Sequence, residues 1–550
     1  MNSKNPILTH ISELNTEFAE GSHNSVSEYS HLVPDFRSLT DLDSSITNAA
    51  DPCYVRIKQL PDRSFFMMYN EKINGDGIRM LKSKNGRDWE EYSTVFHPTE
   101  KKKYANPEAI ILQNGDILAC AAWRIAPEYL TDNTMGGIET VRSADGGKTW
   151  SEPQLVHTGL TWEPYFLQLR SGEIQLYWTN TTRYNLPNGN NTSTGTAMLR
   201  SFDNGYSWSG DPKKPYDAQI VSQQPTEFYD GVQFYTDQMP VARELQNGTI
   251  ILGLECRRDR KGTCDLSLSY STDNWATAIP VDGEGPEDKN KNMYHGGGPY
   301  VDQFASGETV FKYQQWRLYN IRLGDPTGRD FSAPPVKLSK MVNFSGFEKL
   351  KDEHSILCSG SVAYPAEDGK EHYFIRLHTV RLNHALHCPK GMGKEWEENR
   401  DALFVGSVSR AQASYRFAKS EKGLRLRIDR IDDSLTEEDT CTVRFSLPEG
   451  NENYLQFTVS PYGITESFTV KNGIKEEAES SCSVTVCAAK NSSEYNGYIA
   501  EAEICGCFED VLRVLPSLVN KDEDGEAVTD IHPEADTQNT EKWIPIFFDK

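Results

Sequence analysis

The chain has 550 residues, of which 37% are hydrophobic and 11% aromatic, enough to bury one large core and a smaller one. Its 57 lysines and arginines against 80 aspartates and glutamates give a formal net charge of −23. A chain this acidic repels phosphate backbones and anionic lipid headgroups, so we expect neither a nucleic-acid nor a membrane partner. The oligomeric state stays open.

The N-terminal residues bear on where the protein is found. MNSKNPILTHISELN lacks the apolar core of a signal peptide, and no segment approaches the roughly 20 apolar residues of a membrane-spanning helix. The eleven cysteines are an odd number without paired spacing, which favours free thiols in a reducing compartment. We expect a cytoplasmic protein, or a secreted one if a leader is missing from this sequence.

Residues 1–45 form a polar extension, expected to add an outer strand or to lie on the surface. Six similar segments follow, each an apolar run, a turn with Gly, Asp or Asn, and a second apolar run. Because one such unit cannot bury its apolar face alone, the repetition predicts an all-β, six-bladed β-propeller over residues 46–395. The segments begin at Tyr54, Asn106, Glu163, Gln238, Gly297 and Ser359.

A second pattern follows several of these hairpins: SADGGKTW from Ser143 and SFDNGYSW from Ser201, with shorter versions from Ser83 and Ser271. This is the Asp-box (BNR repeat) S-x-D-x-G-x-T-W, and on it the chain resembles the sialidase-like six-bladed propellers. Asp and Ser side chains accept from the backbone of a tight turn, Gly supplies a positive φ, and Trp packs between sheets. We therefore interpret Asp145 and Asp203 as structural and not as catalytic acids.

The hairpin ends predict a site. Antiparallel pairing places the start of the first strand and the end of the second together, opposite the turn. If the hairpins are the inner pairs of their blades, these ends meet at one mouth of the central channel. Carboxylates, arginines, amides and indoles there suit a sugar, although charged residues at strand ends are also ordinary rim residues. We predict Glu163 and Glu255 as catalytic, and as substrate contacts Arg56, Glu108, Trp123, Arg124, Trp178, Asn180, Asp237, His295, Tyr300 and Trp316.

One mismatch separates the chain from the sialidases, which bind a substrate carboxylate through three arginines. Arg56 in YVRI resembles the first of these. When the hairpin of the second arginine is aligned on Asn247-Gly248, Glu255 takes that arginine's place, and the inner hairpin from Gly297 to Gln314 has no arginine for the third. A carboxylate there would repel a substrate carboxylate, which favours a neutral sugar.

Three phrases carry a second resemblance: Trp162-Glu163-Pro164 with Leu176-Tyr177-Trp178, Met239-Pro240-Val241-Ala242 with Glu255, and Gly298-Pro299-Tyr300. On them, over about residues 50–390, the chain is more similar to the exo-arabinanase-like glycoside hydrolases of the same superfamily. The resemblance implies that Glu163 and Glu255 are the two catalytic carboxyls. The segments QLYWTN and YTDQMP depart from that family's pattern, so the sugar preference can differ.

These residues predict an exo-acting glycoside hydrolase that retains the anomeric configuration, with one glutamate as nucleophile and the other as acid and base. The carboxyl groups should then lie about 5–5.5 Å apart, whereas about 6.5–9.5 Å would indicate inversion. The sequence does not assign the two roles, and Glu108 is a reserve carboxylate. Two alternatives remain open: an exo-sialidase that takes arginines from elsewhere, such as Arg257, Arg317 or Arg376, and a non-catalytic glycan-binding propeller.

Histidines give a competing hypothesis, because His384 and His387 have an HxxH spacing. That spacing on a surface strand brings no ligands together, so we expect no metal and no cofactor. His295, beside Gly296-Gly297-Gly298, is better explained as a sugar contact.

Residues 400–550 change to short alternating strands without Asp-boxes, which predicts a β-sandwich. The succession YRFAKSEKGLRLRIDRIDDS, VRFSL, YLQFTV and GYIAEAEI resembles family nine carbohydrate-binding modules. Trp543 is the only tryptophan after residue 400, so the aromatic clamp of those modules is not evident. Packing against the propeller competes with independent sugar binding as the role of this unit.

Overall fold

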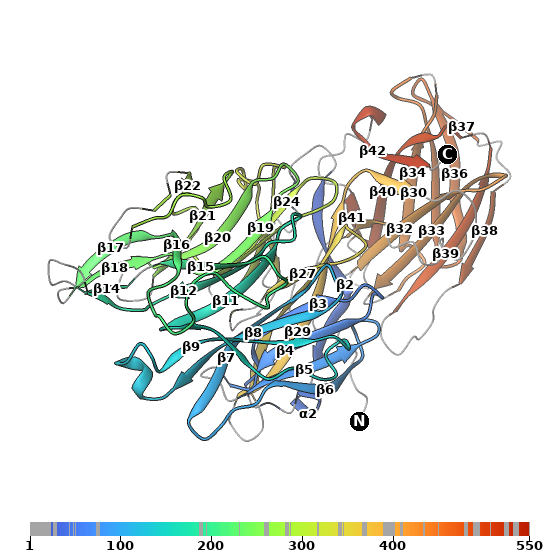
Figure 1. Cartoon of the computed structure of the whole chain (residues 1–550). Coiled ribbons are helices and arrows are strands. Elements are labelled where there is room, and N and C mark those ends of the chain that lie inside the picture. The colour runs from blue at the N-terminus through green and yellow to red at the C-terminus, as the bar shows by residue number, and fades with distance from the viewer. Residues whose placement is uncertain are drawn as a thin grey trace.

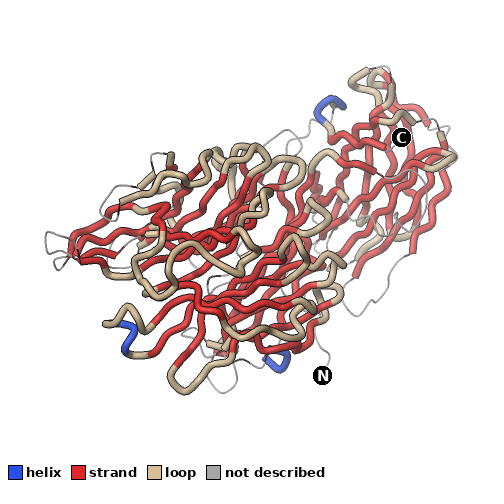
Figure 2. The backbone as a smooth tube through the Cα atoms, in the orientation of Figure 1, coloured by secondary structure: helices blue, strands red, loops and turns tan. Residues whose placement is uncertain are grey.

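The computed structural model is almost entirely β, which confirms the predicted class. Short helical segments are α2 (Ser44–Thr47) and the 3-10 turns Glu128–Leu130 and Thr540–Lys542. Figure 2 shows how strands dominate the trace. The structure describes residues 24–25, 30–42, 44–47, 49, 51–72, 77–185, 191–193, 195–229, 232–257, 263–280, 285–286, 288–315, 318–338, 344, 346–365, 371–388, 402–406, 411–432, 435–448, 450–477, 482–487, 496–506, 508–521, 527–531 and 538–548.

Five four-stranded sheets follow one another along the described chain, each beginning at one of the predicted hairpins. Sheet one is β3 (Cys53–Gln59), β4 (Phe65–Asn70), β5 (Ile78–Ser83) and β6 (Trp89–Phe96). Sheet two is β7 (Lys102–Ile111), β8 (Ile117–Ile125), β9 (Gly136–Ser143) and β10 (Gln154–Thr158). Sheet three is β11 (Thr161–Gln168), β12 (Ile174–Asn180), β15 (Thr196–Ser201) and β16 (Gln219–Ser222). Sheet four is β19 (Gln238–Glu244), β20 (Ile250–Arg257), β21 (Cys264–Ser271) and β22 (Lys289–Asn290). Sheet five is β23 (Gly297–Gln303), β24 (Thr309–Gln315), β25 (Leu318–Gly324) and β26 (Val336–Leu338).

Sheet six is completed by the N-terminal part of the chain. It contains β27 (Phe347–Lys349), β28 (Ser355–Pro365) and β29 (Glu371–Asn383), and β2 (His31–Leu42) pairs antiparallel with β29. The short β1 (Asn24–Ser25) pairs with β2. Of the two roles expected for the extension, residues 31–42 therefore take that of an outer strand.

Hydrophobic clusters join each sheet to the next and the sixth to the first. Met68 of sheet one shares a cluster with Ala109 of sheet two, and sheets two to six are linked in the same way. Val55 and Ile57 of sheet one pack with Ile375 and Leu377 of sheet six. The six sheets thus form a closed ring, with β3, β7, β11, β19, β23 and β27 as the first strand of each sheet.

The turn after β15 shows what the repeated Ser-Asp pattern does. Asp203 Oδ1 accepts from the backbone N–H of Ser207 at 2.8 Å, and Ser201 Oγ accepts from that of Gly205 at 2.8 Å. Asp145 accepts from the backbone of Lys148 and Thr149 in the same manner. The structural interpretation of both aspartates is confirmed by these bonds.

A further sheet of short strands was not expected from the sequence. It contains β13 (Tyr184–Asn185), β14 (Asn191–Ser193), β17 (Gln224–Tyr229) and β18 (Val232–Thr236), and it projects to the far left of Figure 1. These strands come from the connections that follow β12 and β16.

The C-terminal part forms two sheets that share one hydrophobic core, shown in orange and red in Figure 1. The larger sheet contains β30 (Leu386–Cys388), β42 (Ile544–Phe548), β40 (Val511–Lys521), β34 (Thr440–Ser446), β35 (Tyr454–Ser460), β36 (Gly463–Lys471), β37 (Ile474–Glu477) and β41 (Ala527–Ile531). The smaller contains β31 (Leu403–Val405), β32 (Ala411–Lys419), β33 (Gly423–Asp432), β39 (Asn496–Cys505) and β38 (Cys482–Cys487).

Contacts tie these C-terminal sheets to the ring. Val33 of β2 packs with Ala402 and Phe404, and the Gln412 side chain donates to the carbonyl of Pro34 at 2.5 Å. Trp543 has no exposed surface, so it offers no platform to a sugar.

Candidate active site

A bulge near the start of the inner strand recurs in sheets one to five. In each, the pairing register with the second strand slips by one residue, and the residue within the slip has a positive φ. A bulge of this kind changes the direction in which a side chain points. A positive φ at a residue other than glycine is strained, and such residues cluster at functional sites. Phe344 precedes β27 with the same backbone conformation (φ 58°). The five bulge residues are Tyr54 (φ 52°), Asn106 (55°), Glu163 (46°), Met239 (49°) and Gly298 (61°).

Glu163 is held by hydroxyl groups from two other strands. The Tyr54 hydroxyl donates to its Oε1 at 3.2 Å, and the Thr179 hydroxyl donates to its Oε2 at 2.7 Å. The backbone N–H of Met239 donates to Thr179 Oγ1 at 2.8 Å, which leaves the Thr179 proton directed at Glu163. Burial raises the pKa of Glu163 to about 7, although these hydroxyls stabilise its charged form.

Glu255 lies near the end of β20, also half-buried. Its Oε2 accepts from the backbone N–H of Gly298 at 3.0 Å, and Cys264 Sγ lies 3.3 Å from its Oε1. A Cβ at Gly297 would lie 2.4 Å from Oε2, so the absence of a side chain there makes room for the carboxyl. Burial raises the pKa of Glu255, while the Gly298 N–H and the charges of Lys312 and Arg257 oppose the shift.

The two predicted catalytic carboxyls face one another electrostatically. The charge of Glu255 raises the pKa of Glu163. Glu163 lies near the start of β11, and Glu255 pairs with Gln238 at the start of β19, so each glutamate lies at the end of its hairpin opposite the turn. Both remain partly exposed. Burial raises the pKa values of both carboxyls, which favours a protonated carboxyl at this site, the form that acid catalysis needs.

Arg124, predicted as a substrate contact, lies near Glu163. Its guanidinium stacks 3.4 Å from the ring centroid of the half-buried Trp162, and it donates to Asn106 Oδ1 at 3.0 Å. Its charge lowers the pKa of Glu163. Trp162, Tyr54 and Thr179 were not predicted as site residues, although Tyr54 begins the first hairpin and Trp162 stands in a phrase that carries the family resemblance.

Arg56, Glu108 and Tyr300 lie deeper along the inner strands and contact one another. Glu108 Oε2 lies 3.0 Å from Arg56 Nε and accepts from the Tyr300 hydroxyl at 3.2 Å, while Lys58 Nζ lies 3.2 Å from its Oε1. The Glu108 side chain is 1% exposed. These residues form a buried polar network, and the expectation that they contact substrate directly is corrected, because they are buried and satisfy one another.

Trp123 and Trp178 are turned into the core. Trp178 has no exposed surface and packs beside His157, with ring centroids 4.6 Å apart, in the cluster between sheets two and three. Trp123 packs between sheets one and two, with Lys102 Nζ 4.8 Å above its ring. Side chains alternate between the two faces of a strand, so an indole at a strand end can face the next sheet. The prediction that Trp123 and Trp178 contact the sugar is therefore wrong, because both indoles are buried between sheets.

Asn180 and Asp237 have structural partners instead of open faces. Asn180 accepts from the backbone N–H of Thr182 at 3.1 Å, and Asp237 forms a fully buried ion pair with Lys289 at 2.6 Å. His295 keeps 45% of its side chain exposed, and its Nδ1 lies 3.3 Å from Asp265. It stands two residues before Gly297, whose missing side chain makes room for the Glu255 carboxyl. Trp316 lies outside the described residues.

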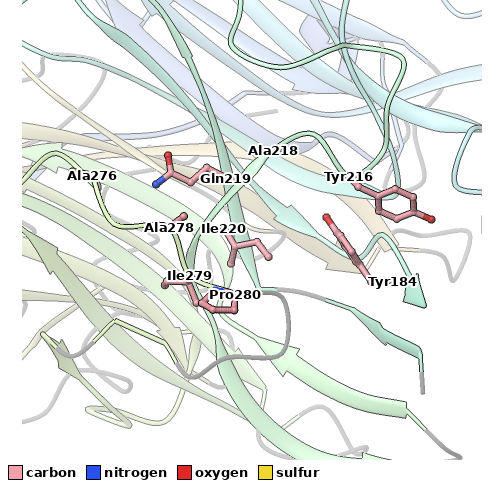
Figure 3. Close-up of a pocket in the computed structure, with 9 residues that line it drawn as sticks. All are labelled: Tyr184, Tyr216, Ala218, Gln219, Ile220, Ala276, Ala278, Ile279 and Pro280. Carbon is pink, nitrogen blue, oxygen red and sulfur yellow. The ribbon is translucent and has the colours of Figure 1, made fainter. Parts of the chain in front are cut away.

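Two cavities lie away from Glu163 and Glu255. One of about 410 Å³ lies on the outer side of sheets three and four; Figure 3 shows Tyr184 and Tyr216 beside each other at one end of it and Ile279 and Pro280 at the other. A second, of about 330 Å³, lies at the turn ends of the inner hairpins, near Arg170 and Gln246.

In the described part of the chain, no group of three or more His, Cys, Asp or Glu is arranged to hold a metal ion. The described helices include none that is long and apolar enough to cross a membrane.

No protein-family model matches the chain, and no curated protein matches its sequence. Among solved structures, a protein of unknown function from Dyadobacter fermentans is 13% identical, covers 64% of this chain and 99% of its own, and has a TM-score of 0.47. An α-L-arabinofuranosidase from Fusarium graminearum is 16% identical over 62% of this chain and 97% of its own, with a TM-score of 0.44. The arabinanase of Bacillus subtilis is 11% identical over 60% and 94%, with a TM-score of 0.33. Similarities of this size assign no activity to this chain.

Proposed function

We propose that this protein is an exo-acting glycoside hydrolase of the sialidase-like superfamily, that its six sheets are the blades of a propeller, and that it retains the anomeric configuration of a neutral, arabinan-type sugar. The observation that carries the proposal is the pair Glu163 and Glu255. Two half-buried carboxyls with raised pKa values, from neighbouring sheets and in electrostatic contact, are the minimum machinery of glycoside hydrolysis.

In the proposed reaction, one carboxylate attacks the anomeric carbon while the other, protonated, gives its proton to the departing oxygen. The C–O bond to the leaving group breaks as the bond to the carboxylate forms. The second carboxyl, now ionised, takes a proton from water, and that water displaces the enzyme from the anomeric carbon. Glu163, with its pKa raised to about 7, is partly protonated near neutral pH in the free protein.

The charges near the pair support a neutral sugar. Arg56 is occupied by Glu108, and Arg376 forms an ion pair with Asp41 at 2.7 Å, so neither is open to a substrate carboxylate. Arg124 is stacked on Trp162. Two of the arginines that a carboxylate clamp would need are therefore already paired with carboxylates. Arg257, whose charge acts on Glu255, is exposed, so the substrate assay below decides against or for the exo-sialidase alternative.

The buried network supports action at chain ends. Arg56 and Lys58 of sheet one and Tyr300 of sheet five meet Glu108 of sheet two, so buried side chains of three sheets converge between their first strands. A site blocked on this side accepts the end of a glycan more readily than its middle.

The test uses Glu163→Gln and Glu255→Gln separately, against arabino-oligosaccharides and sialosides. We expect the parent protein to cleave the former, and each variant to lose turnover while it still binds the sugar. Turnover of sialosides alone would favour the sialidase, and binding without turnover of any glycan by the parent would favour the glycan-binding propeller.

The roles of the two glutamates follow from an activated aryl arabinoside with added azide. The variant that lacks the acid and base should keep its first step on this substrate, because a good leaving group needs no proton, and should give an azide product of retained configuration. The variant that lacks the nucleophile should give the inverted azide.

A further inference from the structure

An aromatic ring is exposed beside the candidate active site. Phe344 keeps 36% of its surface exposed, although it stacks on the ring of Tyr54 with centroids 4.8 Å apart and an interplanar angle of 17°. Tyr54 is the residue whose hydroxyl holds Glu163. The partly exposed Phe344 is therefore one aromatic layer away from Glu163.

Phe344 is also fixed in place. Its carbonyl accepts from Arg56 Nη1 at 2.9 Å, and Arg56 in turn is held by the buried Glu108. Its positive φ (58°) is a conformation that a bulky residue rarely adopts without a constraint. Tyr54, which supports one side of the ring, is 4% exposed and packs with Met239 and Cys53. Phe344 is thus fixed through its backbone and supported on one side by Tyr54, and it remains partly exposed. Such a residue is suited to stack on a ligand.

The other large exposed aromatics on the described sheets of the ring lie elsewhere. Phe202, Tyr206 and Tyr216 all belong to the connection between β15 and β16, and Arg142 covers Tyr206 at 4.2 Å. Phe344 differs from them because it precedes a first strand of the ring and contacts the residue that positions Glu163.

We propose that Phe344 is the stacking platform for the sugar ring bound at the mouth, with Tyr54 as its rigid backing. This inference rests on the proposed function and names a specificity-determining residue for it. The exposed aromatic surface packs against the C–H face of a furanose or pyranose, which places the anomeric carbon toward Glu163 and Glu255. A ring without a flat C–H face, or one with a charged group on that face, is bound less well.

The test compares Phe344→Ala and Phe344→Trp with Phe202→Ala, whose exposed ring (76%) lies on an outer turn. Binding of an arabino-oligosaccharide is measured by calorimetry on a Glu255→Gln background, where the sugar stays intact. We expect Phe344→Ala to weaken binding about tenfold, and Phe344→Trp and Phe202→Ala to bind as their parent does.

Steady-state kinetics on the otherwise unchanged protein separates stacking from mere support of Tyr54. A platform raises KM in Phe344→Ala and leaves the pH profile of kcat in place. Unchanged binding in Phe344→Ala, or a pH profile shifted like that of Tyr54→Phe with unchanged binding, would overturn the inference. Absence of turnover in the parent would refute the proposed hydrolase alone, because the binding series still reports on the platform.

Discussion

The Tyr54 hydroxyl donates a hydrogen bond to Oε1 of Glu163, although the two residues belong to different sheets of the ring. Both have a positive φ, and each lies where its inner strand slips by one residue against its partner. The bulges thus direct Tyr54 of sheet one and Glu163 of sheet three toward each other.

Replacing Tyr54 with Phe should raise the pKa of Glu163, because the lost hydroxyl stabilises the charged carboxylate. The limb of the pH–rate profile that reports Glu163 should move to higher pH. Tyr184→Phe is the matched control, since that hydroxyl contacts Asn180 and not the carboxyl pair. A profile that does not move in Tyr54→Phe would show that this hydrogen bond has no part in setting the carboxyl's charge.

Replacing Thr179 with Val should cost both stability and activity. The hydroxyl links the Met239 backbone N–H to Glu163, and valine leaves that N–H without its acceptor. An unsatisfied buried donor costs about 1–3 kcal/mol, read as a lower denaturant midpoint. Thr179→Ser keeps the hydroxyl and should retain most of the stability and turnover. If Val and Ser behave alike, the hydroxyl relay is not what holds Glu163.

The stability of the protein should depend on pH through Glu163. Its folded-state pKa is raised to about 7 from an ordinary 4.5, so the folded protein holds this proton more tightly than the unfolded chain. The stability that this proton contributes is fully present below the pKa of the unfolded chain, and it is lost as pH rises through the folded-state pKa of about 7. Glu163→Gln should therefore gain about 2 kcal/mol relative to the parent between about pH 5 and pH 8. Denaturant midpoints of both proteins at the two pH values measure it, and an equal gap at both would contradict the raised pKa.

Glu108→Ala should destabilise the fold more than it impairs the chemistry. The change leaves Arg56 and Lys58 buried without their shared carboxylate, a loss of about 3–5 kcal/mol for a broken buried pair. Unfolding midpoints measure the loss, and the kcat of the protein that remains folded should stay within about tenfold of the parent. A stable variant with no turnover would return Glu108 to the role of a catalytic carboxylate.

The sequence predicts the sheets well because each strand carries its own signal. The six hairpins were visible as repeated apolar runs, and antiparallel pairing alone was enough to place Glu163 and Glu255 at one end of the ring. The alternation of side chains along β12 also predicts which way Trp178 points. It lies on the same face as Ile174 and Leu176, and that face packs against sheet two. The prediction that Trp178 contacts the sugar is wrong because it treated every side chain at a strand end as facing the same way.

Other features depend on partners that are distant in the chain. Asp237 is buried by Lys289, and β2 closes sheet six only when it meets β29. The bulges shift the side-chain alternation by one residue, so Thr179 and Tyr54 reach Glu163 in a way that no local pattern shows. Arg56, Glu108 and Tyr300 had the composition of a sugar site, and only the structure shows that they satisfy one another.

The central claim is that Glu163 and Glu255 together hydrolyse a glycosidic bond with retention. Proton NMR of an arabino-oligosaccharide digest, recorded before the product equilibrates, identifies the anomer that is released first. We expect the same configuration as the substrate, and no product when either glutamate is replaced by Gln. Release of the inverted anomer, or undiminished hydrolysis by both Gln variants, would contradict it.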